Sequence, residues 1–121
     1  MHAEGPLRTP TSTEEAALKR LLSENFAGRD ALLAQVENLK VKQIDMEGSL
    51  QLAPGPDAIR AKVEQRIPVE AEFPDDDGVS VRVLLHVVDG FLAELEIFKD
   101  DLTAIGKTVT PDNLQLRHAD R

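Results

Sequence analysis

The 121-residue sequence contains no cysteine, no tryptophan and no tyrosine. The absence of cysteine excludes disulfides, cysteine-ligated zinc and thiol catalysis. The only aromatic residues are four Phe, about 3% of the chain. The core must therefore be built from Val, Leu, Ile and Ala, and no Tyr or Trp ring is available to stack on bases or sugars. No apolar run approaches the ~18 residues that a membrane-spanning helix needs.

Basic residues are also few, with 14 Lys and Arg against 22 Asp and Glu, for a formal net charge of −8. Binding to nucleic acid and to anionic membranes depends on Lys and Arg, so the sequence predicts neither kind of partner. An acidic surface favours a cationic partner, but it also serves simply to keep a protein soluble, and solubility is the more common reason for it.

The chain length fits a single domain. Gly5, Pro6 and Pro10 in a segment of low apolar content predict a flexible arm over residues 1–11. We expect one domain over 12–116 and a flexible tail over 117–121. The residues from Met1 to Pro6 show no basic start followed by an apolar stretch, which predicts no signal peptide and a cytoplasmic location.

Two helices are expected first. Ser12 to Glu15 forms a capping box, and Leu18, Leu21 and Leu22 follow at helical spacing, which predicts a helix over about 13–24. A second helix is expected from about Asp30 to Asn38.

From Leu39 onward apolar residues recur with a period of two, which predicts strands. The expected strands cover residues 40–44, 49–52, 61–73, 79–87, 91–97 and, after a proline, 113–116. Helices followed by strands indicate an α+β fold, here two N-terminal helices packed on one face of an antiparallel meander sheet of five to six strands.

The hairpin around Asp89-Gly90 allows two registers. A two-residue loop places Val83 opposite Glu96 and mixes the apolar and charged faces. A three-residue loop pairs Val83 with Leu95 and Arg82 with Glu96, keeping the faces separate. A shift of one residue moves every side chain to the other face, so we expect the three-residue loop.

Three features of the sequence are candidates for a metal or catalytic site. His86 lies in mid-strand, with Arg66, Leu92 and Glu94 as expected neighbours, and a metal site there would need further converging ligands. Glu94 and Glu96 point to one side of a strand and form either an ion ladder with Arg82 or an acid–base pair. The run Asp75 to Gly78 resembles half of a calcium loop, yet strands rather than helices flank it, which favours a solvated turn. The sequence therefore predicts no metal and no cofactor.

One sheet face carries more apolar residues than a solvated face needs. Either the tail after residue 100 covers this face or another chain does. We expect an interaction face that binds a second copy of the chain or another protein, formed by Arg82, Leu84, His86, Leu92, Glu94, Glu96 and Phe98.

The stretch from His86 to Asp101, with Phe26 to Asp30 upstream, resembles a family of small uncharacterised bacterial proteins. That family has a helical start and a hairpin that ends in a Leu-x-Glu-Leu-Glu-Ile type strand. The resemblance implies a bacterial domain without an assigned activity, and it carries over no functional residues.

The sequence shows no catalytic motif, so its function is unknown and the prediction leans against an enzyme. The preferred hypothesis is a non-enzymatic binding or interaction module of a bacterial cytoplasm. Two alternatives stay open. One is a small-molecule binding protein or enzyme with a pocket between helices and sheet. The other is an antitoxin or immunity-type partner protein.

Overall fold

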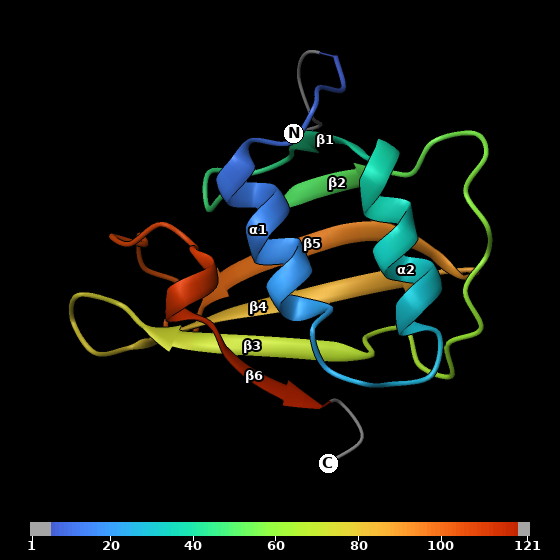
Figure 1. Cartoon of the computed structure of the whole chain (residues 1–121). Helices are drawn as coiled ribbons and strands as arrows, with labels where there is room; N and C mark the ends of the chain where they lie inside the picture. Colours follow the sequence, from blue (N-terminus) through green and yellow to red (C-terminus); the bar gives the residue numbers. More distant parts are fainter. Residues whose placement is uncertain (1–5, 119–121) are drawn as a thin grey trace.

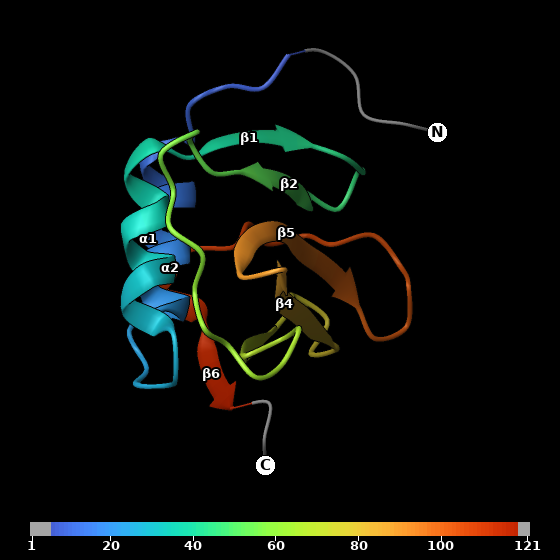
Figure 2. The same cartoon turned by 90° about the vertical axis from the view of Figure 1, so that its right-hand side faces the viewer.

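The computed structural model describes residues 6–118 and shows two helices and a six-stranded antiparallel sheet. Figures 1 and 2 show both helices on the same side of the sheet, and within residues 6–118 no helix lies on the opposite side. The predicted α+β class and the strand number are confirmed. No helix in the described residues is long and apolar enough to cross a membrane.

Helix α1 (Ser12–Leu21) begins one residue earlier than the sequence pattern suggested. The N-cap is Thr11, whose hydroxyl accepts from the backbone N–H of Glu14, while the Glu14 carboxylate accepts from the N–H of Thr11. The expected box from Ser12 to Glu15 is therefore wrong by one position. Arg8 selects the box that forms, because its guanidinium donates to both oxygens of Glu14 at 2.7 and 2.9 Å.

Helix α2 (Arg29–Gln35) and the 3-10 turn η1 (Val36–Asn38) together cover the helix predicted from about Asp30 to Asn38. Gln35 is buried at the end of α2 and connects three segments of the chain. Its amide nitrogen donates to the carbonyls of Ile59 and Gly90, and its oxygen accepts from the N–H of Leu92. This one side chain ties the helical layer to the end of the longest hairpin.

The strands are β1 (Lys40–Gln43), β2 (Leu50–Ala53), β3 (Val69–Pro74), β4 (Ser80–Val88), β5 (Phe91–Lys99) and β6 (Gln115–His118). Their spatial order is β1-β2-β5-β4-β3-β6, so the sheet is a β1–β2 hairpin set beside a β3–β4–β5 meander. The short C-terminal strand β6 pairs with β3 at one edge. At the other edge, Arg8 exchanges two backbone hydrogen bonds with Val41 of β1, so this part of the predicted arm is bound to the sheet.

A long loop over residues 54–68 replaces most of the strand predicted for 61–73 (Figure 1). The loop carries the chain past α2 from β2 to β3, which are not neighbours in the sheet. Ala61 still donates its N–H to the carbonyl of Gly90, and Arg66 still accepts from the N–H of Val87. The alternation of apolar and polar residues over 61–68 therefore belongs to a loop that lies against the end of the β4–β5 hairpin. Within the predicted strand, only Val69–Pro74 pairs with a neighbouring strand.

The predicted register of the β4–β5 hairpin is wrong. Asp89 and Gly90 both have positive φ, 54° and 84°, and form a two-residue turn in which Val88 pairs with Phe91. Type I′ turns require positive φ at both central residues and suit Asp-Gly. A bulge between His86 and Val87 then adds one residue to β5, so that Val83 pairs with Ile97 and Arg82 with Phe98. The bulge keeps the preferred turn and still separates the two faces.

The core lies between the helices and the inward face of β3, β4 and β5. On β3, β4 and β5 it includes buried apolar residues at alternate positions, together with two on β5 that flank the bulge: Val69, Ala71, Phe73, Val81, Val83, Leu85, Val87, Leu92, Leu95 and Ile97. The same cluster includes Val41, Leu50 and Leu52 of β1 and β2. From the helices, Ala17, Leu18 and Leu21 of α1 and Leu32 of α2 belong to it.

Candidate functional site

The sheet side away from the helices is an open face, which we call the outer face. It is formed by half-buried residues that alternate with the core positions of β3, β4 and β5: Glu70, Glu72, Arg82, Leu84, His86, Glu94, Glu96 and Phe98. Six of the seven predicted interaction residues lie on it.

The prediction is wrong for the seventh residue, Leu92, which does not lie on the outer face. Its side chain is only 1% exposed and belongs to the core. The bulge is the cause, because the extra residue puts Leu92 and Leu95, three positions apart, on the same face. A lysine at position 92 would therefore enter the core and could not probe an interaction surface.

His86 is the centre of a polar cluster on the outer face. Its Nδ1 accepts from Nε of Arg66 at 3.0 Å, and its Nε2 lies 2.8 Å from Oε1 of Glu96. Glu94 is the direct cross-strand partner of His86. The predicted proximity of Arg66 and Glu94 to His86 is confirmed, whereas Leu92 lies on the other face.

This geometry selects one tautomer of the imidazole. Arg66 can only donate, so Nδ1 must carry the lone pair, and Nε2–H then donates to Glu96. Arg66, His86 and Glu96 thus form a short donor chain across the sheet surface. The side chain of His86 is 12% exposed and that of Glu96 is 39% exposed, so the chain ends at solvent.

His86, Glu94 and Glu96 also form a group of possible metal ligands. One ligand atom from each lies within 4.8 Å of the other two. The sequence interpretation required further ligands to converge on His86, and the hairpin register provides two carboxylates there.

A second polar network occupies the other end of the outer face. Nε of Arg82 donates to Oδ1 of Asp100 at 3.0 Å and lies 3.7 Å from Glu72. Arg117 of β6 pairs with Glu72 at 2.6 Å. The expected ladder between Arg82 and Glu96 does not form because the register differs, and Glu96 pairs with His86 instead.

Sequence reasoning missed a buried ion cluster at the end of the core. Lys99 Nζ contacts Asp75 at 2.9 Å and Asp77 at 2.8 Å, and the side chains of Lys99 and Asp75 are only 3% and 2% exposed. Asp75 also accepts from the backbone N–H groups of Gly106 and Lys107. Asp76, Asp77 and Gly78 form an exposed turn, as predicted, whereas Asp75 is buried. The ammonium of Lys99 lies between the carboxylates of Asp75 and Asp77.

Both charges of this cluster are stabilised by the contacts. The hydrogen bond from Lys99 holds the pKa of Asp75 far below its ordinary value, and the backbone donors add to this effect. The hydrogen bonds to Asp77 and Asp75 raise the pKa of Lys99 well above its ordinary value. The position of Lys99, in phase with the core residues of β5, was the sequence signal for a buried cation.

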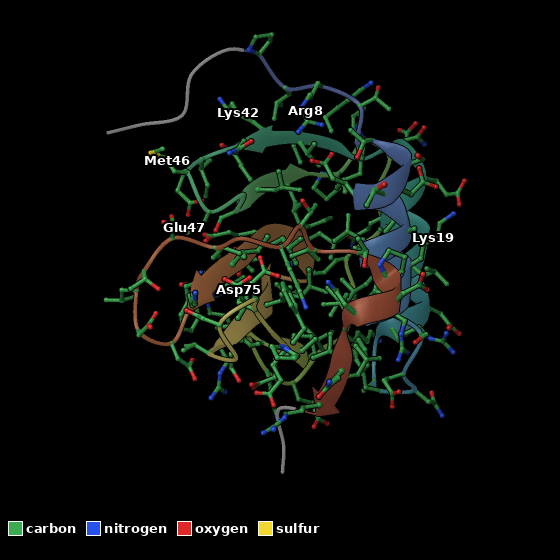
Figure 3. The ribbon with its side chains drawn as sticks, turned by 90° about the vertical axis from the view of Figure 1, so that its left-hand side faces the viewer. Arg8, Lys19, Lys42, Met46, Glu47 and Asp75 are labelled. Carbon is green, nitrogen blue, oxygen red and sulfur yellow. The ribbon has the colours of Figure 1, made fainter. Side chains whose placement is uncertain are left out.

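Three hollows lie elsewhere on the described surface. A groove of about 850 Å³ runs between α2, the loop from Pro54 to Ile59 and Leu7. A shallow hollow of about 440 Å³ lies beside the Asp89-Gly90 turn. The third, of about 330 Å³, lies between α1, the β1–β2 turn and residues 105–109, and its floor includes Leu50, Leu95 and Ile97. Figure 3 shows Met46 and Glu47 at the β1–β2 turn, and it shows Asp75, which follows β3, on the same side of the molecule. None of these hollows is lined by His86, Glu94 or Glu96.

The model of a domain of unknown function, DUF6984, matches residues 7–109. The expected membership of an uncharacterised family is confirmed. No curated protein and no solved structure matches the chain.

Proposed function

The chain belongs to the DUF6984 family, and we propose that it is a non-enzymatic interaction module that binds a protein partner through its outer face. The observation that carries the proposal is the placement of the polar residues. His86, Glu94 and Glu96 lie on an open sheet surface, while the described hollows are lined by other residues. Catalytic and small-molecule sites are usually concave, whereas protein interfaces are broad and shallow.

The chemistry of the outer face supports a protein partner. Leu84 and Phe98 lie in its middle strands, and Val88 at its end is 38% exposed. The ion pairs of Arg82 with Asp100 and of Arg117 with Glu72 lie around them. An apolar centre with a polar rim is the usual composition of a recognition surface.

We propose a second copy of the chain as the partner. A two-fold dimer is the commonest assembly of soluble proteins, because one self-complementary patch is enough to form it. The outer face carries both signs of charge, with Arg66 and Arg82 beside Glu94 and Glu96, so that rim charges can pair across a two-fold axis. As an extension of the same proposal, we place the module in the bacterial cytoplasm, where a net charge of −8 favours solubility.

Light scattering of the purified protein tests this proposal. We expect a dimer at high micromolar concentration, and Leu84→Lys should shift it to monomer without loss of the fold, because the new charge lies at the centre of the interface in both subunits. Met46→Lys is the matched control, since Met46 is 95% exposed on the turn between β1 and β2 and is not one of the outer-face residues. A monomeric wild-type protein at that concentration would contradict the proposal.

A second candidate function is the binding of a small apolar molecule in the hollow between α1 and the sheet. The supporting observation is its floor of core side chains, Leu50, Leu95 and Ile97, beneath a volume of about 330 Å³. That volume is at the lower end of the range of ligand pockets. Ile105→Trp, which narrows this hollow, should abolish such binding and leave the association state unchanged.

A further inference from the structure

The hairpin register brings three metal-ligating side chains together. His86 and Glu94 are direct cross-strand partners, and Glu96 lies two residues farther along β5 on the same face. Side chains of neighbouring strands on one face lie about 5 Å apart at Cβ, which is within reach of a common ion. The ligand atoms of all three residues lie within 4.8 Å of one another.

We propose that His86 Nε2 and the carboxylates of Glu94 and Glu96 form a binding site for a divalent transition-metal ion of the Zn²⁺ type. Zn²⁺ accepts imidazole nitrogen and carboxylate oxygen as ligands at about 2.0–2.2 Å, which places tetrahedral ligands about 3.4 Å apart. The distance of 2.8 Å between Nε2 and Oε1 of Glu96 needs to open by only about 0.6 Å. The ligand atoms lie no more than 4.8 Å apart, so the other separations need to close by about 1.4 Å at most. Rotation of the two glutamate side chains can supply both changes.

The charges of the cluster favour a cation. Glu94 and Glu96 are both half-buried, and only one guanidinium, that of Arg66, contacts the cluster among the described residues. The carboxylate of Glu94 forms no hydrogen bond or ion pair with another residue of 6–118. Its carboxylate is therefore available as a ligand, and three protein ligands would leave a fourth position open for water or for a group from a partner.

Arg66 competes with the metal. A metal-ligating histidine normally donates its other ring N–H to an acceptor, but Nδ1 of His86 faces a donor, Nε of Arg66, at 3.0 Å. Metal binding at Nε2 requires the opposite tautomer, so the Arg66 side chain must leave. It is exposed, and the loop is held by its backbone carbonyl, which accepts from Val87 at 2.7 Å. The side chain can therefore swing away while the loop stays in place.

Isothermal titration with Zn²⁺, and the visible spectrum of bound Co²⁺, test the site on the full chain. We expect one equivalent to bind. His86→Gln and Glu94→Gln should each weaken binding of Zn²⁺ by about 10- to 100-fold or more. Loss of a residue that only supports a ligand already costs that much, and each of these variants removes a direct ligand. Arg66→Gln should instead tighten binding about tenfold, because it removes a cation and replaces a group that can only donate with an amide whose oxygen can accept from Nδ1–H of His86.

Two controls separate this site from other binding. Glu72→Gln makes the same change of charge on the outer face, outside the cluster, and should leave the affinity for Zn²⁺ unchanged. Replacement of His2 and His118 by Asn should also leave it unchanged. Equal affinity in wild type and His86→Gln, or weaker binding by Arg66→Gln, would overturn the proposal. Because the readout is metal affinity, these outcomes do not depend on whether the outer face also binds a protein.

Discussion

Among single residues, Lys99 and Asp75 determine how the segment after β5 is held. Lys99 reaches from the end of β5 to two carboxylates that follow β3, and Asp75 accepts the N–H groups of Gly106 and Lys107. A buried charge is tolerated only when its partners are in place, so removal of one partner leaves the other uncompensated. The cluster therefore fixes residues 104–107 over the end of the sheet.

Asp75→Asn should lower the melting temperature and speed amide exchange at Gly106 and Lys107 about tenfold or more, because both lose an anionic acceptor. The pKa of Asp75 is lowered, so its contribution to stability is present above its ordinary pKa of 3.8 and is lost as the pH falls further. The pKa of Lys99 is raised, so its contribution is complete below 10.5 and is lost only as the pH rises beyond that.

The difference in melting temperature between wild type and Asp75→Asn should therefore be constant from about pH 5 to pH 9 and shrink below about pH 4. Asp57→Asn, an exposed position, is the control and should show no such dependence. A difference that grows on acidification would contradict this account.

At the scale of elements, the β4–β5 hairpin resolves a conflict between its turn and its faces. Asp89-Gly90 favours a two-residue turn, but that turn with regular strands would place Glu96 opposite Val83 on the core face. The bulge at His86/Val87 satisfies both, since it shifts the pairing by one residue after the turn. The same shift moves Glu94 beside His86 and thereby creates the candidate metal site.

Leu92→Ala tests the bulge. Leu92 is 1% exposed, so its truncation should lower the free energy of unfolding by about 2–5 kcal/mol, measured by denaturant titration. Val88→Ala on the outer face should cost under about 1 kcal/mol, because Val88 is already 38% exposed. Equal costs for the two variants would place Leu92 on the outer face and refute the bulged register.

At the scale of the whole molecule, two layers leave one sheet face open (Figure 2). The helices bury the inner face, and the core they close is continuous from α1 to β5. Because of that core, we expect the fold to form without any ion on the outer face. A metal there would act as a ligand of the folded state and would not be a structural component.

Removal of divalent metals with EDTA should therefore leave the melting temperature of the protein unchanged. Added Zn²⁺ should raise the melting temperature, because binding to the native state adds about 2.7 kcal/mol to the free energy of unfolding when free Zn²⁺ is at about a hundred times Kd. His86→Gln should retain the fold and lose this increase. A lower melting temperature in EDTA alone would show that the fold depends on a metal.

Local patterns in the sequence determined the helices, the strand periodicity and the residues of the outer face. Leu18 and Leu21 at helical spacing, and Val81, Val83 and Leu85 at alternate positions, report burial directly, because each depends only on which side of its own element is apolar. For this reason the α+β class and the placement of His86 and Glu94 on one sheet face could be predicted.

Only the tertiary structure decided the register, the strand order and the ion cluster. The pairing of β2 with β5 and the contact of Lys99 with Asp75 each join segments that are far apart in the chain. The bulge reconciles two local preferences, that of the turn and that of the strand faces. Leu92 shows the consequence, since its own neighbours suggest an exposed position and only the packing of the hairpin against the helices buries it. The physical reason is that pairing energies depend on which strands meet, and alternation along a single strand does not contain that information.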